Sequence, residues 1–66
     1  MPSLDNLNDL LTEAAKLLNN AAEEVRDNKL NKHENIKKIG ESLVNIYEIQ
    51  LEIYKVRPDL TPDILK

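Results

Sequence analysis

The side chains of this 66-residue chain that could take part in catalysis are few and scattered. His33 is the only histidine, and Glu34 beside it is not followed by the second histidine that a zinc-protease helix needs. Ser3 and Ser42 lack a plausible histidine partner, and the chain has no cysteine to act as a nucleophile. One glycine, Gly40, cannot build a glycine-rich phosphate loop. The sequence therefore predicts a protein that is not an enzyme and binds no cofactor.

Three glutamates, Glu41, Glu48 and Glu52, share one side of the second apolar segment. They project away from its apolar residues, so we interpret them as a solvated face rather than a metal site. A di-metal centre in a helical bundle also needs Glu-x-x-His on two helices, and the chain contains no such motif. No metal site is expected.

Gln50 is the polar residue with the most informative position. On a helical wheel it lies near the centre of an apolar arc, between Leu43 and Ile46 on one side and Tyr47 and Tyr54 on the other. A buried amide destabilises a protein unless it is paired, and in coiled coils one such residue can set the alignment or the number of chains. Gln50 either pairs with its copy in a second chain, or it bonds a tyrosine hydroxyl or reaches solvent at an imperfect seam.

Tyr47 and Tyr54 lie seven residues apart and share a helix face with Val44 and Leu51. One interpretation is an interface core with the two hydroxyls at its rim. The alternative is a stripe that binds a helix from another protein.

Two helices must carry these residues. In the first, apolar residues recur at alternating steps of three and four, which is typical of one helix face; they are Leu4, Leu7, Leu11, Ala14, Leu18, Ala21 and Val25. This pattern predicts a helix over residues 4–27 with Ser3 as its N-cap. The same spacing recurs at Ile36, Ile39, Leu43, Ile46 and Ile53. It predicts a second helix over 32–57, stopped by Pro58. Residues 49–53 alternate as in a strand, but the surrounding pattern favours helix.

The break at residues 28–30 is short, so the two helices should lie antiparallel. Asn28 is expected to adopt the left-handed conformation that ends helices. Asn31 with Glu34 has the spacing of a capping box. Gly40 costs about 1 kcal/mol relative to alanine in a helix, so we expect it to permit a close contact.

The chain divides into a hairpin over residues 1–57 and a tail over 58–66. In the tail, Thr61 and Pro62 have the types of an N-cap and a first helical residue. They predict either a short packed turn or the start of a helix that continues in a larger protein.

The second helix has more apolar surface than a hairpin can bury. Its apolar positions sweep about 240° of the helix, against about 160° in the first. A chain this short gains only about 3–5 kcal/mol from one core, and without cysteine oligomerisation is the remaining stabiliser. We therefore predict an all-α fold, an antiparallel helical hairpin that pairs into a homodimeric four-helix bundle. The predicted interface consists of Ile39, Leu43, Val44, Ile46, Tyr47, Gln50, Leu51, Ile53 and Tyr54.

The net charge of −3 hides an uneven distribution. Residues 1–25 carry five acidic side chains and one basic one, and residues 26–38 carry five basic and two acidic ones, giving −4 and +3. The basic set comprises Arg26, Lys29, Lys32, Lys37 and Lys38. The overall negative charge disfavours nucleic acid and membrane as partners.

No secretory signal and no apolar run of membrane-spanning length is visible, so we expect a cytoplasmic protein.

The basic residues at the hairpin tip have two interpretations. In an antiparallel dimer of hairpins, each tip lies beside the acidic terminal end of the other copy, and we favour this interpretation. Alternatively, the lysines contact nucleic-acid phosphates. In size and hairpin layout the chain resembles the Rop-like plasmid regulators, whose hairpins pair into a four-helix bundle that binds RNA. The resemblance implies no role for any individual residue.

The sequence thus favours a small non-enzymatic interaction module or regulator that works as a homo-oligomeric bundle. The first alternative is a Rop-like nucleic-acid-binding regulator that uses the basic tip. The second is an oligomerisation or docking segment of a larger protein.

Overall fold

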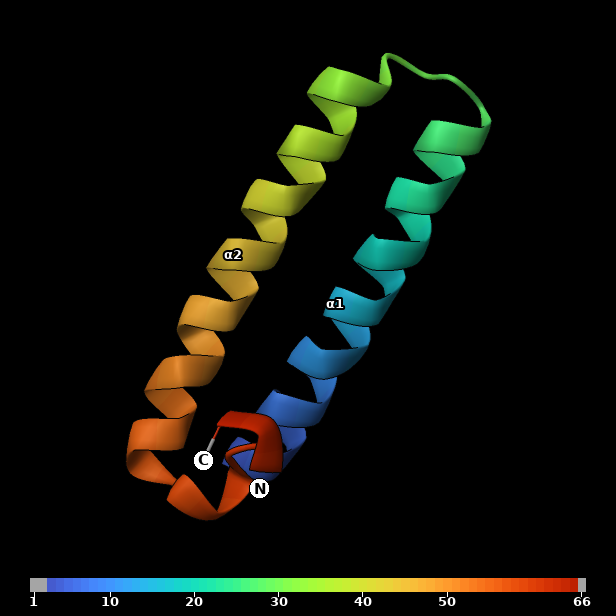
Figure 1. The fold of residues 1–66 in the computed structure, drawn as a ribbon. Coiled ribbons are helices and arrows are strands. Elements are labelled where there is room, and N and C mark those ends of the chain that lie inside the picture. Colours follow the sequence, from blue (N-terminus) through green and yellow to red (C-terminus); the bar gives the residue numbers. More distant parts are fainter. Residues whose placement is uncertain (1–2, 66) are drawn as a thin grey trace.

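A computed structural model describes residues 3–65 as two long helices followed by two short 3-10 turns. Helix α1 spans Leu4–Asp27 and helix α2 spans Lys32–Val56; the turns are η1, Pro58–Leu60, and η2, Asp63–Leu65. The two helices lie side by side and run in opposite directions (Figure 1). The predicted all-α class and the hairpin of two packed helices are confirmed.

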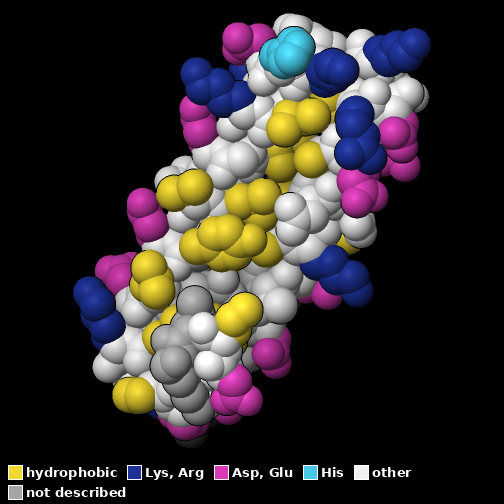
Figure 2. Space-filling model, in the orientation of Figure 1, with side chains coloured by type: hydrophobic (Ala, Val, Ile, Leu, Met, Phe, Trp, Pro, Cys, Tyr) yellow, Lys and Arg dark blue, Asp and Glu magenta, His cyan; other side chains and the backbone are white. Residues whose placement is uncertain are grey.

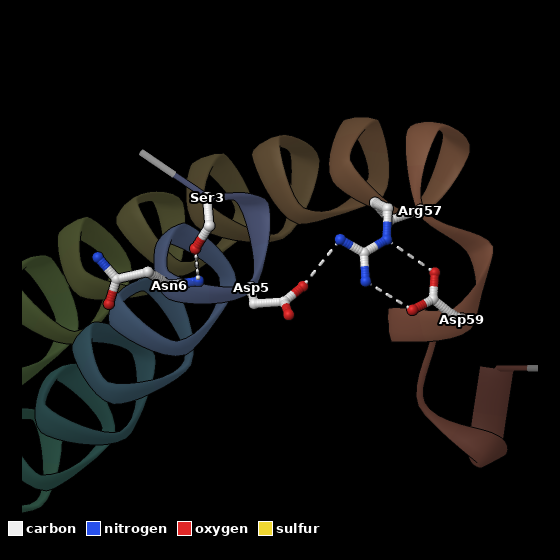
Figure 3. Close-up of polar contacts among 5 residues, drawn as sticks. All are labelled: Ser3, Asp5, Asn6, Arg57 and Asp59. Carbon is white, nitrogen blue, oxygen red and sulfur yellow. Dashed lines mark hydrogen bonds and ion pairs between the residues drawn. The ribbon is translucent and has the colours of Figure 1, made fainter. Parts of the chain in front are cut away.

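The start of α1 is capped as predicted. Ser3 has extended backbone (φ −139°), and its Oγ accepts a hydrogen bond of 3.1 Å from the backbone N–H of Asn6 (Figure 3). At the other end, the side-chain amide of Asn28 donates to the carbonyl oxygen of Glu24 at 2.7 Å. Asn28 itself is right-handed (φ −87°), so the predicted left-handed conformation at this residue is wrong.

The left-handed residues of the connection are Lys29 (φ 55°) and Asn31 (φ 41°). The predicted capping box at Asn31 is also wrong, because its side chain makes no cap hydrogen bond. A side-chain N-cap usually needs extended backbone, and Asn31 is left-handed. The connection is instead held by Asn35, whose side-chain amide donates to the carbonyl oxygen of Leu30 at 2.7 Å.

Helix α2 ends at Val56, one residue before the predicted end. Arg57 leaves the helical region (φ −127°), as expected for a residue that precedes proline. Residues 49–53 are helical rather than extended. In the tail, η2 begins at Asp63 rather than at Pro62. The tail folds back toward the two helices (Figure 1), and its Pro62 lines a pocket with Thr12 of α1 and Tyr54 of α2.

Arg57 fixes the direction in which the tail leaves α2. Its Nε and Nη2 donate to the two carboxylate oxygens of Asp59 at 2.9 and 2.7 Å. Its Nη1 lies 3.0 Å from Oδ1 of Asp5 in the first turn of α1 (Figure 3). The hydrogen bonds to Asp59 and the charge of Asp5 raise the pKa of Arg57 above its ordinary value. Because these side chains are exposed, their ion pairs add little to the stability of the fold. Their main effect is to orient the tail.

The hairpin is a single layer of helices with almost no core. It measures 40 × 26 × 17 Å. Among the described residues, the buried apolar side chains are Ala15 (7% exposed) and Ile53 (4% exposed). A domain normally buries its apolar faces between two packed layers. This layer leaves both of its broad faces open.

Candidate functional site

The described residues contain no side-chain cluster that could form a metal centre. No group of three His, Cys, Asp or Glu side chains gathers where it could hold a metal ion within residues 3–65. His33 is exposed in the first turn of α2. Neither of the two long helices in this range has an apolar stretch sufficient to cross a membrane.

Five of the predicted interface residues lie along the seam between α1 and α2. They follow one another at steps of three and four and are buried or half-buried: Ile39, Leu43, Ile46, Gln50 and Ile53. They face α1 of the same chain, so their first role is to hold the hairpin together. A second layer above or below the seam would still reach the partly exposed edges of Ile39, Leu43 and Ile46.

Gln50 is satisfied within its own chain. It is 6% exposed, and its Nε2 donates to Oδ1 of Asn8 at 3.2 Å and to Oγ1 of Thr12 at 3.1 Å. The Thr12 hydroxyl donates in turn to the carbonyl oxygen of Asn8 at 2.9 Å. We call these three residues the polar clamp. The sequence did not predict either of these partners on α1. It suggested instead that the Gln50 amide pairs with a second copy, bonds a tyrosine hydroxyl or reaches solvent.

The other four predicted interface residues, Val44, Tyr47, Leu51 and Tyr54, lie on one outer side of α2 together with Gly40. We call these five residues the Tyr face. Val44, Tyr47 and Leu51 are each about half exposed, whereas Tyr54 is half-buried. Tyr47, Leu51 and Tyr54 join Gln50 and Pro62 of the tail in lining a pocket of about 420 Å³. Figure 2 shows hydrophobic side chains along the middle of one face of the hairpin, between charged margins.

Gly40 stands at the tip end of the Tyr face and has no close neighbour in its own chain. A Cβ built there meets no atom within 4 Å. The close contact expected at Gly40 is therefore absent within the hairpin. Nothing in the described fold requires glycine at this position, although glycine weakens a helix.

The opposite side of the seam carries a second apolar surface that the sequence-based interface did not include. It consists of Leu7, Leu10 and Leu17 of α1 with Ile49 and Val56 of α2, and we call it the Leu face. Leu10 is 60% exposed and Val56 is 69% exposed. The spacing of these residues could have indicated this face. Leu10 and Leu17 are seven residues apart, as are Ile49 and Val56, and all four lie off the seam.

The basic tip comprises Arg26, Lys29, Lys32, Lys37 and Lys38, all of them exposed at the connected end of the helices. Nε of Arg26 lies 3.6 Å from Oδ1 of its neighbour Asp27. Figure 2 shows the basic side chains gathered at this end, around the single histidine. Because Asp5 and Asp59 lie at the opposite end, the charge asymmetry of the sequence runs along the 40 Å length of the molecule.

Comparison of the chain with known protein families, with characterised proteins and with solved structures finds no match. The class of protein is therefore defined by its fold and surfaces. It is an antiparallel two-helix hairpin with an apolar face on each side of the seam and a basic tip.

Proposed function

We propose that this chain is a small, non-enzymatic protein–protein interaction module that acts as a homo-oligomer, with a homodimeric four-helix bundle as its basic unit. The observation that supports the proposal best is the open single layer. Among the described residues, Ala15 and Ile53 are the buried apolar side chains, whereas eleven large apolar side chains are exposed. Burial of such surface is the main favourable contribution to association.

The amount of exposed surface agrees with a missing partner of similar size. The accessible surface is 5292 Å² for a mass of 7.6 kDa. The scaling of surface with mass gives about 4300 Å² for a folded monomer of this size. The excess of about 1000 Å² is close to the roughly 800 Å² that each partner buries in a typical stable interface.

Charge favours an antiparallel arrangement of the two hairpins. When the tips lie at opposite ends, the net +3 of residues 26–38 comes beside the other copy's residues 1–25, which carry −4. When the tips lie together, the two positive ends repel each other. A closed two-fold pair also uses the same surface on both copies.

Sedimentation equilibrium of the full chain at micromolar concentrations tests this proposal. We expect a species of twice the 7.6 kDa chain mass that dissociates on dilution. Circular dichroism at the same concentrations should lose helical signal as the dimer dissociates, because folding and association are coupled in so small a chain. A folded monomer at every concentration would refute the proposal.

The exposed lysines of the basic tip support a second candidate, a regulator that binds nucleic acid through phosphate contacts. No aromatic residue lies within residues 26–38 to stack on bases, so we rank this candidate second.

The double charge reversal Lys32→Glu with Lys37→Glu separates the two candidates. Under the dimer proposal it should weaken self-association, more strongly at low salt, because attraction to the acidic end of the other copy becomes repulsion. Ultracentrifugation at two salt concentrations measures this effect, with the neutral pair Lys32→Gln and Lys37→Gln as an intermediate. Under the nucleic-acid candidate the dimer should survive while salt-sensitive binding of structured RNA is lost.

A further inference from the structure

The Tyr face has a different shape at each of its two ends. At the tip end, the space above Gly40 is open to a distance of at least 4 Å from the position of a Cβ. At the terminal end, Pro62 of the tail lies with Tyr54 in the wall of one pocket, and Thr61 lies with Tyr54 in the wall of another. The face therefore carries no side chain at its tip end, at Gly40, and is thickened by the tail at its terminal end.

The Tyr face is also self-complementary in its spacing. Its residues follow one another at steps of four, three, four and three, and Tyr47 is the central one. A two-fold axis through Tyr47 that reverses the helix direction places Val44 within one residue, about 1.5 Å, of the level of Leu51 of the second copy. The same axis places Gly40 opposite Tyr54 of the second copy, so the smallest residue meets the thick end.

We propose that a second copy of this chain docks on the Tyr face, with the two α2 helices antiparallel about Tyr47 and each Gly40 receiving Tyr54 and Pro62 of the other copy. This assignment rests on the proposed self-association and specifies its surface, its direction and its closest contact. It explains why a glycine stands where its own chain makes no use of it. It also brings each basic tip to the acidic end of the other copy.

The opposite arrangement and the opposite face both fit less well. A parallel pair would set thick end against thick end and tip against tip. The Leu face contains no glycine, and its α2 half is interrupted by the exposed polar residues Ser42, Asn45 and Glu52.

A double-mutant cycle on Gly40 and Tyr54 tests the assignment by sedimentation equilibrium. The two residues are fourteen positions apart on one straight helix, about 21 Å, so within one chain their effects should add. Gly40→Gln places a side chain where Tyr54 of the second copy would lie and should weaken dimerisation by about tenfold or more, as overpacking of an interface does. Tyr54→Ala should also weaken it, and the double variant should lose clearly less than the product of the two single effects.

The matched control is Asn45→Gln, an exposed change on the other side of α2, which should leave the dimer constant unchanged. Circular dichroism of each variant at high protein concentration separates weaker pairing from damage to the helix. Gly40→Gln improves helix propensity, and its Cβ meets no atom of its own chain within 4 Å, so a loss of dimer with an unchanged helical signal points to the second copy.

Because the chain has no cysteine, disulfide trapping gives an independent readout. Mixing Val44→Cys with Leu51→Cys protein under mild oxidation should yield a linked pair efficiently, whereas the Leu-face mixture of Leu10→Cys with Leu17→Cys should not.

Additive effects in the cycle, or trapping confined to the Leu-face mixture, would overturn this assignment while leaving self-association intact. In that case the Tyr face would belong to another protein. A monomeric wild-type chain would instead defeat the proposed function itself.

Discussion

Replacing Leu43 with aspartate should abolish the helical structure and the self-association of the protein together. Leu43 is half-buried in the seam, between Ile39 and Ile46 on the face of α2 that packs on α1. An unpaired carboxylate there must either be buried or force the helices apart. A chain with only about 3–5 kcal/mol from its core cannot absorb that cost. Circular dichroism and ultracentrifugation should both report an unfolded monomer.

The control for this change is Asn45→Asp, which adds the same charge two residues away on an exposed position of α2. It should keep both the helical signal and the dimer. A folded, monomeric Leu43→Asp protein would show that the hairpin is stable alone, and this result would contradict the coupling of folding to association.

Ile53→Ala should be the most damaging truncation of a single apolar side chain. Ile53 is 4% exposed, the lowest value among the apolar residues described, and it stands in the last turn of α2. Truncation of a buried isoleucine to alanine removes about 2–5 kcal/mol of stability, which is comparable to the whole stability expected for a chain of this length. Urea denaturation at a fixed chain concentration measures the loss, since the stability of a dimer depends on concentration.

Val56→Ala provides the comparison, because Val56 lies three residues further along the same helix and is 69% exposed. Its effect should stay within about 0.5 kcal/mol, as for most surface changes. Equal losses at Ile53 and Val56 would mean that Val56, on the Leu face, is also covered in the assembled protein.

The regular parts of the fold could be predicted from the sequence because they depend on spacing alone. Steps of three and four defined both helices, and Ser3 stands before the first apolar residue with a hydroxyl that can cap. The conformation of the connection was not predictable in the same way. Lys29 and Asn31 are left-handed because the chain must reverse between two packed helices. That requirement overrides the local preference that pointed to Asn28.

The surroundings of the candidate site were predicted less well for a related reason. Gln50 could be placed inside the apolar arc, but its partners belong to the other helix and depend on how the two helices align. Asn8 was a usable signal, since it falls on the spacing of Leu4 and Leu11 and lies level with Gln50 in an antiparallel pair. The Leu face was not predicted, because a helical wheel of one helix does not show which of its apolar side chains the packed neighbouring helix leaves exposed.

The polar clamp also has a consequence for the competing compact states of the chain. A seam that repeats aliphatic residues at nearly equal intervals can slide by one heptad, about 10.5 Å, and still match apolar side chains to one another. In such a slipped state Gln50 would lose Asn8 and Thr12 and leave a buried amide without partners, at a cost of about 1–3 kcal/mol. This penalty falls on misaligned hairpins and spares the native one. The clamp therefore widens the energy gap that lets a nearly periodic sequence fold to a single structure.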